Sequence, residues 1–200
     1  MKKLLFTMAA LAAFGLAQAQ EETATSGFAK NDVFVSGSLG FRSQKTGDEK
    51  INNFNVTPRV GYFVSDNIAV GAQLGFNSGK NTYNANGTMV EVKSTGFEAG
   101  AFARYYGTPG RAFSFFGQLS ASYNTTKNES QGSESKVNGF SVGLAPGISY
   151  FVSDHIAFET TFGILNYSSS KPDANGAEST DTFNLNLNLS NVAFGIIYKF

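Results

Sequence analysis

Eight segments of this chain alternate apolar residues with small polar ones at a period of two, and this pattern restricts the fold more than any other feature. Alternation of this kind is typical of β-strands that have one apolar face. Residues that favour turns separate the segments. The segments cover residues 33–41, 54–64, 68–76, 97–105, 113–123, 140–152, 156–164 and a final run that ends at Phe200. The sequence therefore predicts an all-β fold of eight antiparallel strands.

The connections between these segments are short and long in turn. The short ones are Ser65–Asn67, Gly107–Arg111 and Ser153–His155, and the long polar ones cover residues 43–50, 78–88, 124–136 and 168–181. Short turns at one end and long loops at the other are typical of outer-membrane barrels. The pattern predicts an eight-stranded antiparallel up-and-down transmembrane β-barrel with short periplasmic turns and longer extracellular loops.

Composition indicates which face of the strands meets lipid. Charged residues make up only 15% of the chain, whereas Phe and Tyr number 20 and 8. The face opposite the apolar one consists mainly of Gly, Ser and Gln, which is a poor solvent face but suits a narrow lumen filled by side chains. We therefore expect the apolar face, with aromatic residues near both strand ends, to face the membrane.

The first 19 residues have the features of a secretory signal. Lys2 and Lys3 precede the apolar run LLFTMAALAAFGLA, and Ala17-Gln18-Ala19 fits a cleavage site. We expect cleavage after Ala19, a periplasmic lead-in over residues 20–31 and a barrel domain over residues 32–200. The apolar run is too short for a typical membrane-spanning anchor.

Two stretches of the sequence repeat each other. PRVGYFVSDNIAVGAQLGF begins at Pro58, and PGISYFVSDHIAFETTFGI begins at Pro146. Because proline cannot donate to a β-ladder, we expect a local bulge or strain at each. The apolar residues of the last segment also change from odd to even numbers, which predicts a further bulge near Ser190-Asn191.

The strand phase points several charged side chains into the lumen. These are Arg59, Glu98, Arg104, Glu159 and Lys199. A charge buried in a narrow lumen must be paired, so the phase predicts a carboxylate–guanidinium contact that joins Arg59 or Arg104 to Glu98 or Glu159. Such a network could plug the lumen or act as the gate of a pore. Four phenylalanines with the same inward phase are predicted to fill the lumen beside the short turns: Phe63, Phe102, Phe116 and Phe151.

The sequence offers no constellation for enzymatic chemistry. His155 is the only histidine, and its neighbours Ser153 and Asp154 are too close in the chain to converge on it as a triad. There is no Cys and no carboxylate cluster with metal-ligand spacing, so neither a metal nor another cofactor is expected. The formal net charge is zero, which does not suggest nucleic acid as a partner.

With these residues in view, the chain resembles the small outer-membrane β-barrels, that is, OmpX-like barrels and the transmembrane domain of OmpA. The resemblance is carried by the signal, by the GYFVSDNIAVG and SYFVSDHIAF turn motifs, and by the terminal NVAFGIIYKF. It implies a location in the bacterial outer membrane. It also implies that the barrel-assembly machinery recognises the alternating C-terminal residues, which are Phe194, Ile196, Tyr198 and Phe200.

Barrels of this family include adhesins, structural anchors, small channels and a few enzymes, so the resemblance leaves the activity open. We expect a non-enzymatic barrel that contacts outer-membrane lipid and has a plugged polar lumen. Its role would be structural or adhesive, with the four long loops as a surface for an extracellular partner. The alternative is a small OmpW-like channel for small or apolar solutes.

Overall fold

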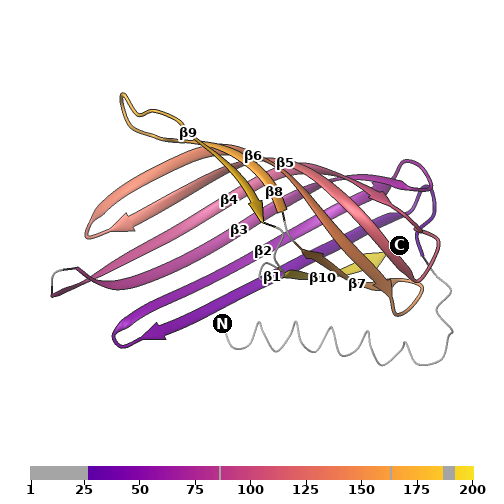
Figure 1. Cartoon of the computed structure of the whole chain (residues 1–200), viewed down its shortest axis with the longest axis horizontal. Coiled ribbons are helices and arrows are strands. Elements are labelled where there is room, and N and C mark those ends of the chain that lie inside the picture. The colour runs from indigo at the N-terminus through magenta and orange to yellow at the C-terminus, as the bar shows by residue number, and fades with distance from the viewer. Residues whose placement is uncertain (1–26, 86, 163, 187–191) are drawn as a thin grey trace.

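A computed structural model describes residues 27–85, 87–162, 164–186 and 192–200, and it contains strands and turns but no helix in this part of the chain (Figure 1). The strands are β1 (Val33–Thr46), β2 (Glu49–Phe63), β3 (Ile68–Ala85), β4 (Thr88–Tyr106), β5 (Phe113–Ser130), β6 (Ser133–Phe151), β7 (Ile156–Phe162), β8 (Ile164–Pro172), β9 (Thr180–Asn186) and β10 (Val192–Lys199). The predicted signal peptide and residues 20–26 lie outside the described residues.

The strands form one antiparallel sheet that closes on itself. β1 to β6 pair in sequence order, and β10 pairs with both β7 and β1. β7 and β8 both pair with β6, so together they make the seventh strand of the barrel. β9 and β10 make the eighth strand in the same way, because β9 pairs with β8 and β10 with β7. The predicted eight-stranded antiparallel barrel is confirmed.

The two ends of the barrel differ in how far the chain projects from them. One end, called here the short-turn end, carries the tight connections and the C-terminus, and the hairpins project from the other, which is called the hairpin end (Figure 1). Most residues that the sequence assigned to long loops are in fact strand, and only 173–179 form a longer connection. In these extensions the apolar alternation stops, although the backbone pairing continues. The sequence pattern therefore missed these extensions.

Pro58 does not produce a bulge. The β2–β3 ladder pairs Val56 with Phe76 and Arg59 with Gln73, and it is interrupted only between them. Across the interruption, three residue steps of β2 lie opposite three residue steps of β3, so the register is unchanged. The prediction of a bulge at Pro58 is wrong. The missing donor interrupts the ladder, but neither strand contains an extra residue.

At Pro146 the irregularity lies in the opposite strand. β6 pairs Gly147 with Thr161 of β7 but Leu144 with Leu165 of β8, so four residue steps face three. This extra residue is a β-bulge, and it reverses which side chains face outward. Tyr167 is accordingly exposed in β8, whereas the sequence pattern had kept the even-numbered residues outward up to Ile164. The bulge predicted near Ser190-Asn191 lies outside the described residues.

Closure between the first and last strands is partial. β1 pairs with β10 from Phe34 to Ser38, opposite Lys199 to Gly195. Beyond Ser38, β1 has no partner on this side among the described residues, and β9 pairs there with β8 alone. Among the described residues, the first and last barrel strands are therefore unpaired toward the hairpin end, and this unpaired stretch is called here the seam.

Two rings of aromatic side chains on the outer face mark the membrane-spanning band. The upper ring, toward the hairpin end, has one member on each barrel strand: Phe41, Phe54, Phe76, Phe97, Tyr123, Phe140, Tyr167 and Phe183. The lower ring contains Tyr62, Tyr105, Phe113, Tyr150, Tyr198 and Phe200, all exposed. On β6 the rings are separated by the run from Phe140 to Tyr150, which spans about 25 Å along the barrel axis for ordinary strand rise and tilt. This height matches the apolar band of a membrane barrel.

Candidate functional site in the lumen

The centre of the lumen holds a buried ion pair between β4 and β7. Nη1 of Arg104 lies 2.7 Å from Oε2 of Glu159, and both side chains are almost entirely inaccessible to solvent. The same nitrogen donates to the hydroxyl of Tyr106 at 3.1 Å, and Nε of Arg104 donates to Oε1 of Gln118 at 2.7 Å. These bonds leave little of the guanidinium unsatisfied, as a buried charge requires.

The remaining predicted lumen residues extend this network toward the hairpin end. Nη1 of Arg59 lies 3.6 Å from Oε1 of Glu159. Glu98 makes no ion pair in the described part of the chain, and it is joined through Gln73, whose Nε2 donates to Oε1 of Glu98 at 2.7 Å. Nε of Arg59 in turn lies 3.5 Å from Oε1 of Gln73. The four predicted residues therefore lie in one connected network, in which Gln73 and Gln118 are linkers that charge alone did not reveal.

Beneath the ion pair, aromatic rings fill the lumen down to the short-turn end. The ring centres of Phe116, Phe102 and Phe34 lie 4.5, 5.2 and 5.8 Å from the guanidinium carbon of Arg104. Guanidinium groups stack favourably on aromatic faces. Each of these phenylalanines pairs across the ladder with a glycine, which is Gly61, Gly71 or Gly147, and a Cβ on any of the three would collide with the ring.

The lowest layer is closed by Phe28, which precedes β1. This side chain is only 3% exposed and stacks on Phe63 with ring centroids 4.5 Å apart. It also contacts Tyr106 and Phe151, at centroid distances of 5.2 and 4.8 Å. Phe63, Phe102, Phe116 and Phe151, which were predicted to point inward, are all buried. Phe28 was missed because it stands alone in a polar segment without alternation.

Polar contacts hold the segment around Phe28 in the barrel mouth. Nζ of Lys199 donates to the carbonyl of Gly27 at 2.7 Å and lies 3.8 Å from Oδ2 of Asp32. The backbone N–H of Phe28 donates to the carbonyl of Pro109 at 2.6 Å. Lys199, predicted to point into the lumen, therefore links the last strand to the segment that precedes the first.

On the other side of the ion pair, the lumen is open and polar. A cavity of about 570 Å³ has Arg59, Gln73, Glu98 and Gln118 among its lining residues. Hydroxyl and amide side chains make up most of the remaining wall, including Ser120. The lumen is thus a polar vestibule above a charged layer and an aromatic layer.

The four predicted C-terminal recognition residues all point outward. Phe194, Ile196, Tyr198 and Phe200 are exposed on the lipid-facing side of β10 and its end. The ring of Tyr198 packs edge-on against Phe200 at 5.1 Å and is stacked by His155 at 5.8 Å. His155 also lies beside the carbonyl of Lys199, with Nδ1 at 2.9 Å, so its observed contacts are with the last strand.

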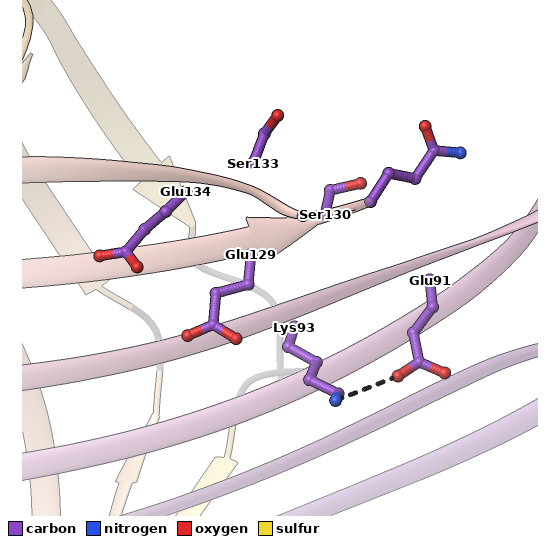
Figure 2. A pocket seen from close by; sticks show the side chains of 8 residues that line it. Glu91, Lys93, Glu129, Ser130, Ser133 and Glu134 are labelled. Carbon is purple, nitrogen blue, oxygen red and sulfur yellow. Dashed lines mark ion pairs between the residues drawn. The ribbon is translucent and has the colours of Figure 1, made fainter.

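A second hollow, of about 430 Å³, lies at the tips of the hairpins β3–β4 and β5–β6 (Figure 2). Glu91, Glu129 and Glu134 line it together with Lys93, and Figure 2 shows Lys93 turned toward Glu91. Three or more carboxylates or histidines arranged to hold a metal ion do not occur in the described ranges. The charges in this hollow are instead paired within the hairpins.

Glu91 gives a measurable electrostatic signature for this tip. A hydrogen bond from Lys80, with Nζ 2.7 Å from Oε2, is the main cause that lowers the pKa of Glu91 below the ordinary glutamate value, and Lys93 adds to it. We expect carbon-detected NMR to give a titration midpoint for Glu91 below that of an unpaired glutamate. Lys80→Met should move the midpoint upward. Because the folded-state pKa is depressed, the contact stabilises the hairpin above the unfolded-state pKa and is lost as pH falls through the folded-state value. An unchanged midpoint in the variant would contradict the assignment.

Comparison with known proteins gives the family. Residues 6–200 match the outer membrane protein beta-barrel domain. No curated protein matches. No described segment is a helix long and apolar enough to cross a membrane.

Among solved structures, the chain is similar to the outer membrane protein OprG from Pseudomonas aeruginosa, with a TM-score of 0.55 and 14% identity over 88% of this chain and 99% of that one. It is also similar to a major outer membrane protein from Thermus thermophilus, with a TM-score of 0.53 and 9% identity over 84% and 98% of the two chains. At these identities the likeness establishes the fold alone. The family match covers nearly the whole sequence, and we conclude that the chain belongs to the outer membrane protein beta-barrel domain family.

Proposed function

We propose that this protein is a non-enzymatic outer-membrane barrel whose lumen is closed and whose role is structural or adhesive. The observation that carries the proposal is the pair of stacked layers across the lumen, namely the Arg104–Glu159 ion pair and the aromatic layer sealed by Phe28. Ions would have to displace a buried charge pair and then a buried layer of rings, and both steps are costly.

We further propose a topology and a set of partners for the barrel. The short-turn end faces the periplasm, the signal peptide is removed after Ala19, and the barrel-assembly machinery reads the four exposed C-terminal residues. The hairpins at residues 43–50, 78–88, 124–136 and 168–181 present polar side chains to an extracellular partner. Paired strands make these projections stiffer than free loops would be, which suits a surface held at a fixed distance from the membrane.

Single-channel recording in planar bilayers tests the closed lumen. We expect no reproducible conductance steps from the wild-type protein. A triple variant, Phe28→Ala with Arg104→Ser and Glu159→Ser, removes both charges together with the sealing ring and should produce steps. Steady steps from the wild-type protein at low voltage would contradict the proposal, and silence of the correctly folded triple variant would show that other residues close the lumen.

A second candidate function is a small OmpW-like channel. It is favoured by the vestibule of about 570 Å³ and by the seam beyond Ser38, where β1 and the last strand are not paired in the described part of the chain. A small apolar solute could leave the vestibule sideways through such a seam without crossing the charged layer. Solute uptake by vesicles without ion conductance would favour this candidate.

A further inference from the structure

The lysines of the hairpin end lie at a constant distance along the strand from the aromatic residues of the upper ring. On seven of the eight barrel strands, a lysine lies four residues beyond the upper-ring aromatic of that strand, toward the hairpin tip. The pairs are Phe41 and Lys45, Phe54 and Lys50, Phe76 and Lys80, Phe97 and Lys93, Tyr123 and Lys127, Phe140 and Lys136, and Tyr167 and Lys171. An even separation along a strand keeps two side chains on the same face. All seven lysines therefore lie on the outward face, and they are called here the lysine ring.

The ladder places lysines of the ring directly opposite one another. Lys45 pairs with Lys50, Lys80 with Lys93, and Lys127 with Lys136. Like charges at directly opposed positions destabilise a sheet, and here the same unfavourable pair recurs in three hairpins. An unfavourable pairing that recurs in this way is expected where the side chains serve a function and not stability.

The internal ion pairs neutralise only part of the ring. Glu91 pairs with Lys80 and Lys93, and Glu129 and Glu134 both pair with Lys127. The other four ring lysines are exposed and form no ion pair within the described residues: Lys45, Lys50, Lys136 and Lys171. Lysines without an ion pair among the described residues are thus left on β1, β2, β6 and β8, which lie on one side of the barrel.

The height of the lysine ring above the upper aromatic ring indicates which part of the membrane the lysines can contact. Four residues of a tilted strand rise about 10 Å, so the ring lies just outside the aromatic level at which the hydrocarbon ends. Lysine side chains can lower their ammonium groups along the apolar surface toward that level. The geometry points to a binding surface for the phosphate groups of outer-leaflet glycolipids, on the side of the barrel formed by β6, β8, β1 and β2.

Lipid titration of the purified full-length barrel in a zwitterionic detergent tests this surface. The probes are diphosphoryl lipid A, its monophosphoryl form and phosphatidylcholine, and the readout is the ligand-induced rise in melting temperature. We expect diphosphoryl lipid A to bind most tightly. Lys45→Gln, Lys136→Gln and Lys171→Gln together should weaken it about a hundredfold at low salt, since each lysine contributes on the order of fivefold. The arginine versions of the same three changes should retain binding.

A matched control removes three cations away from the ring. Lys30, Arg42 and Arg111 are exposed, and Lys30 and Arg111 lie at the short-turn end, whereas Arg42 has the inward phase in β1. Their replacement by glutamine should leave lipid A affinity within about twofold of the wild type. Equal losses in both triple variants, or no preference for the diphosphoryl form, would overturn the proposal. Tight binding of a soluble sulfated polysaccharide without binding of lipid A would also overturn it, in favour of a polyanionic partner outside the membrane.

Discussion

Replacement of Glu159 by alanine is expected to lower the free energy of unfolding by about 3–5 kcal/mol, the usual effect of leaving one member of a buried ion pair without its partner. Arg104 has no exposed side-chain surface and cannot turn toward water, so its charge would remain in the lumen. Arg59 also contacts Glu159, at 3.6 Å, and would add repulsion once the carboxylate is gone. Denaturant unfolding of the barrel in lipid vesicles measures the loss.

The double variant Arg104→Met with Glu159→Leu is the control for this effect. It removes both charges and keeps apolar volume, so it should recover most of the stability lost in Glu159→Ala. A single variant with wild-type stability would show that the pair is not a structural element of the lumen. A double variant that is less stable than the single one would show that the hydrogen bonds to Tyr106 and Gln118 matter more than the charges.

Gly27→Ala is expected to expel Phe28 from the barrel mouth. A Cβ at Gly27 would collide with the backbone carbonyl of Pro109 and the neighbouring Gly110, which belong to a short turn and cannot yield easily. Withdrawal of Phe28 would remove the stacking on Phe63 and cost about 3 kcal/mol of unfolding free energy, comparable to truncating a buried phenylalanine.

Two further variants make this second prediction specific. Phe28→Ala should cost about as much as Gly27→Ala, and the two changes together should cost little more than either alone, because both remove the same contact. Gly110→Ala is the matched control, since a Cβ there comes no closer than 3.9 Å to the carbonyl of Phe28. Additive losses, or an equal loss in Gly110→Ala, would mean that Phe28 stays in place.

The sequence predicted the strands within the membrane well because lipid enforces strict alternation there. Every large apolar residue of the predicted outward face of β4, from Phe97 to Tyr105, is exposed, and Arg104 between them is buried. The same phase rule placed Glu159 in the lumen, and the geometry brings it to Arg104. For each strand, the decision whether odd- or even-numbered residues face outward therefore determined the surroundings of most side chains.

Features that do not depend on alternation were missed. The hairpin extensions are held by backbone pairing between polar residues, for which period-two hydrophobicity carries no signal. The bulge opposite Pro146 depends on a one-residue offset between neighbouring strands, which a single strand's pattern cannot reveal. Phe28 lies in a tight fit that depends on the missing side chain of Gly27, a steric condition that appears only in three dimensions.

The short ladder between β1 and β10 also has a consequence for how the barrel is made and unmade. Among the described residues, the ladder between the first strand and the last runs only from Phe34 to Ser38, and the N–H of Phe200 adds one hydrogen bond to the carbonyl of Val33, whereas β3 and β4 are paired along nearly their whole length. Amide hydrogen exchange should be fastest on this junction, and strand separation on heating should begin there. The hydrogen bonds that complete the barrel would then be the last to form during insertion, and a partially inserted intermediate would be an open sheet with β1 and β10 as its two free edges.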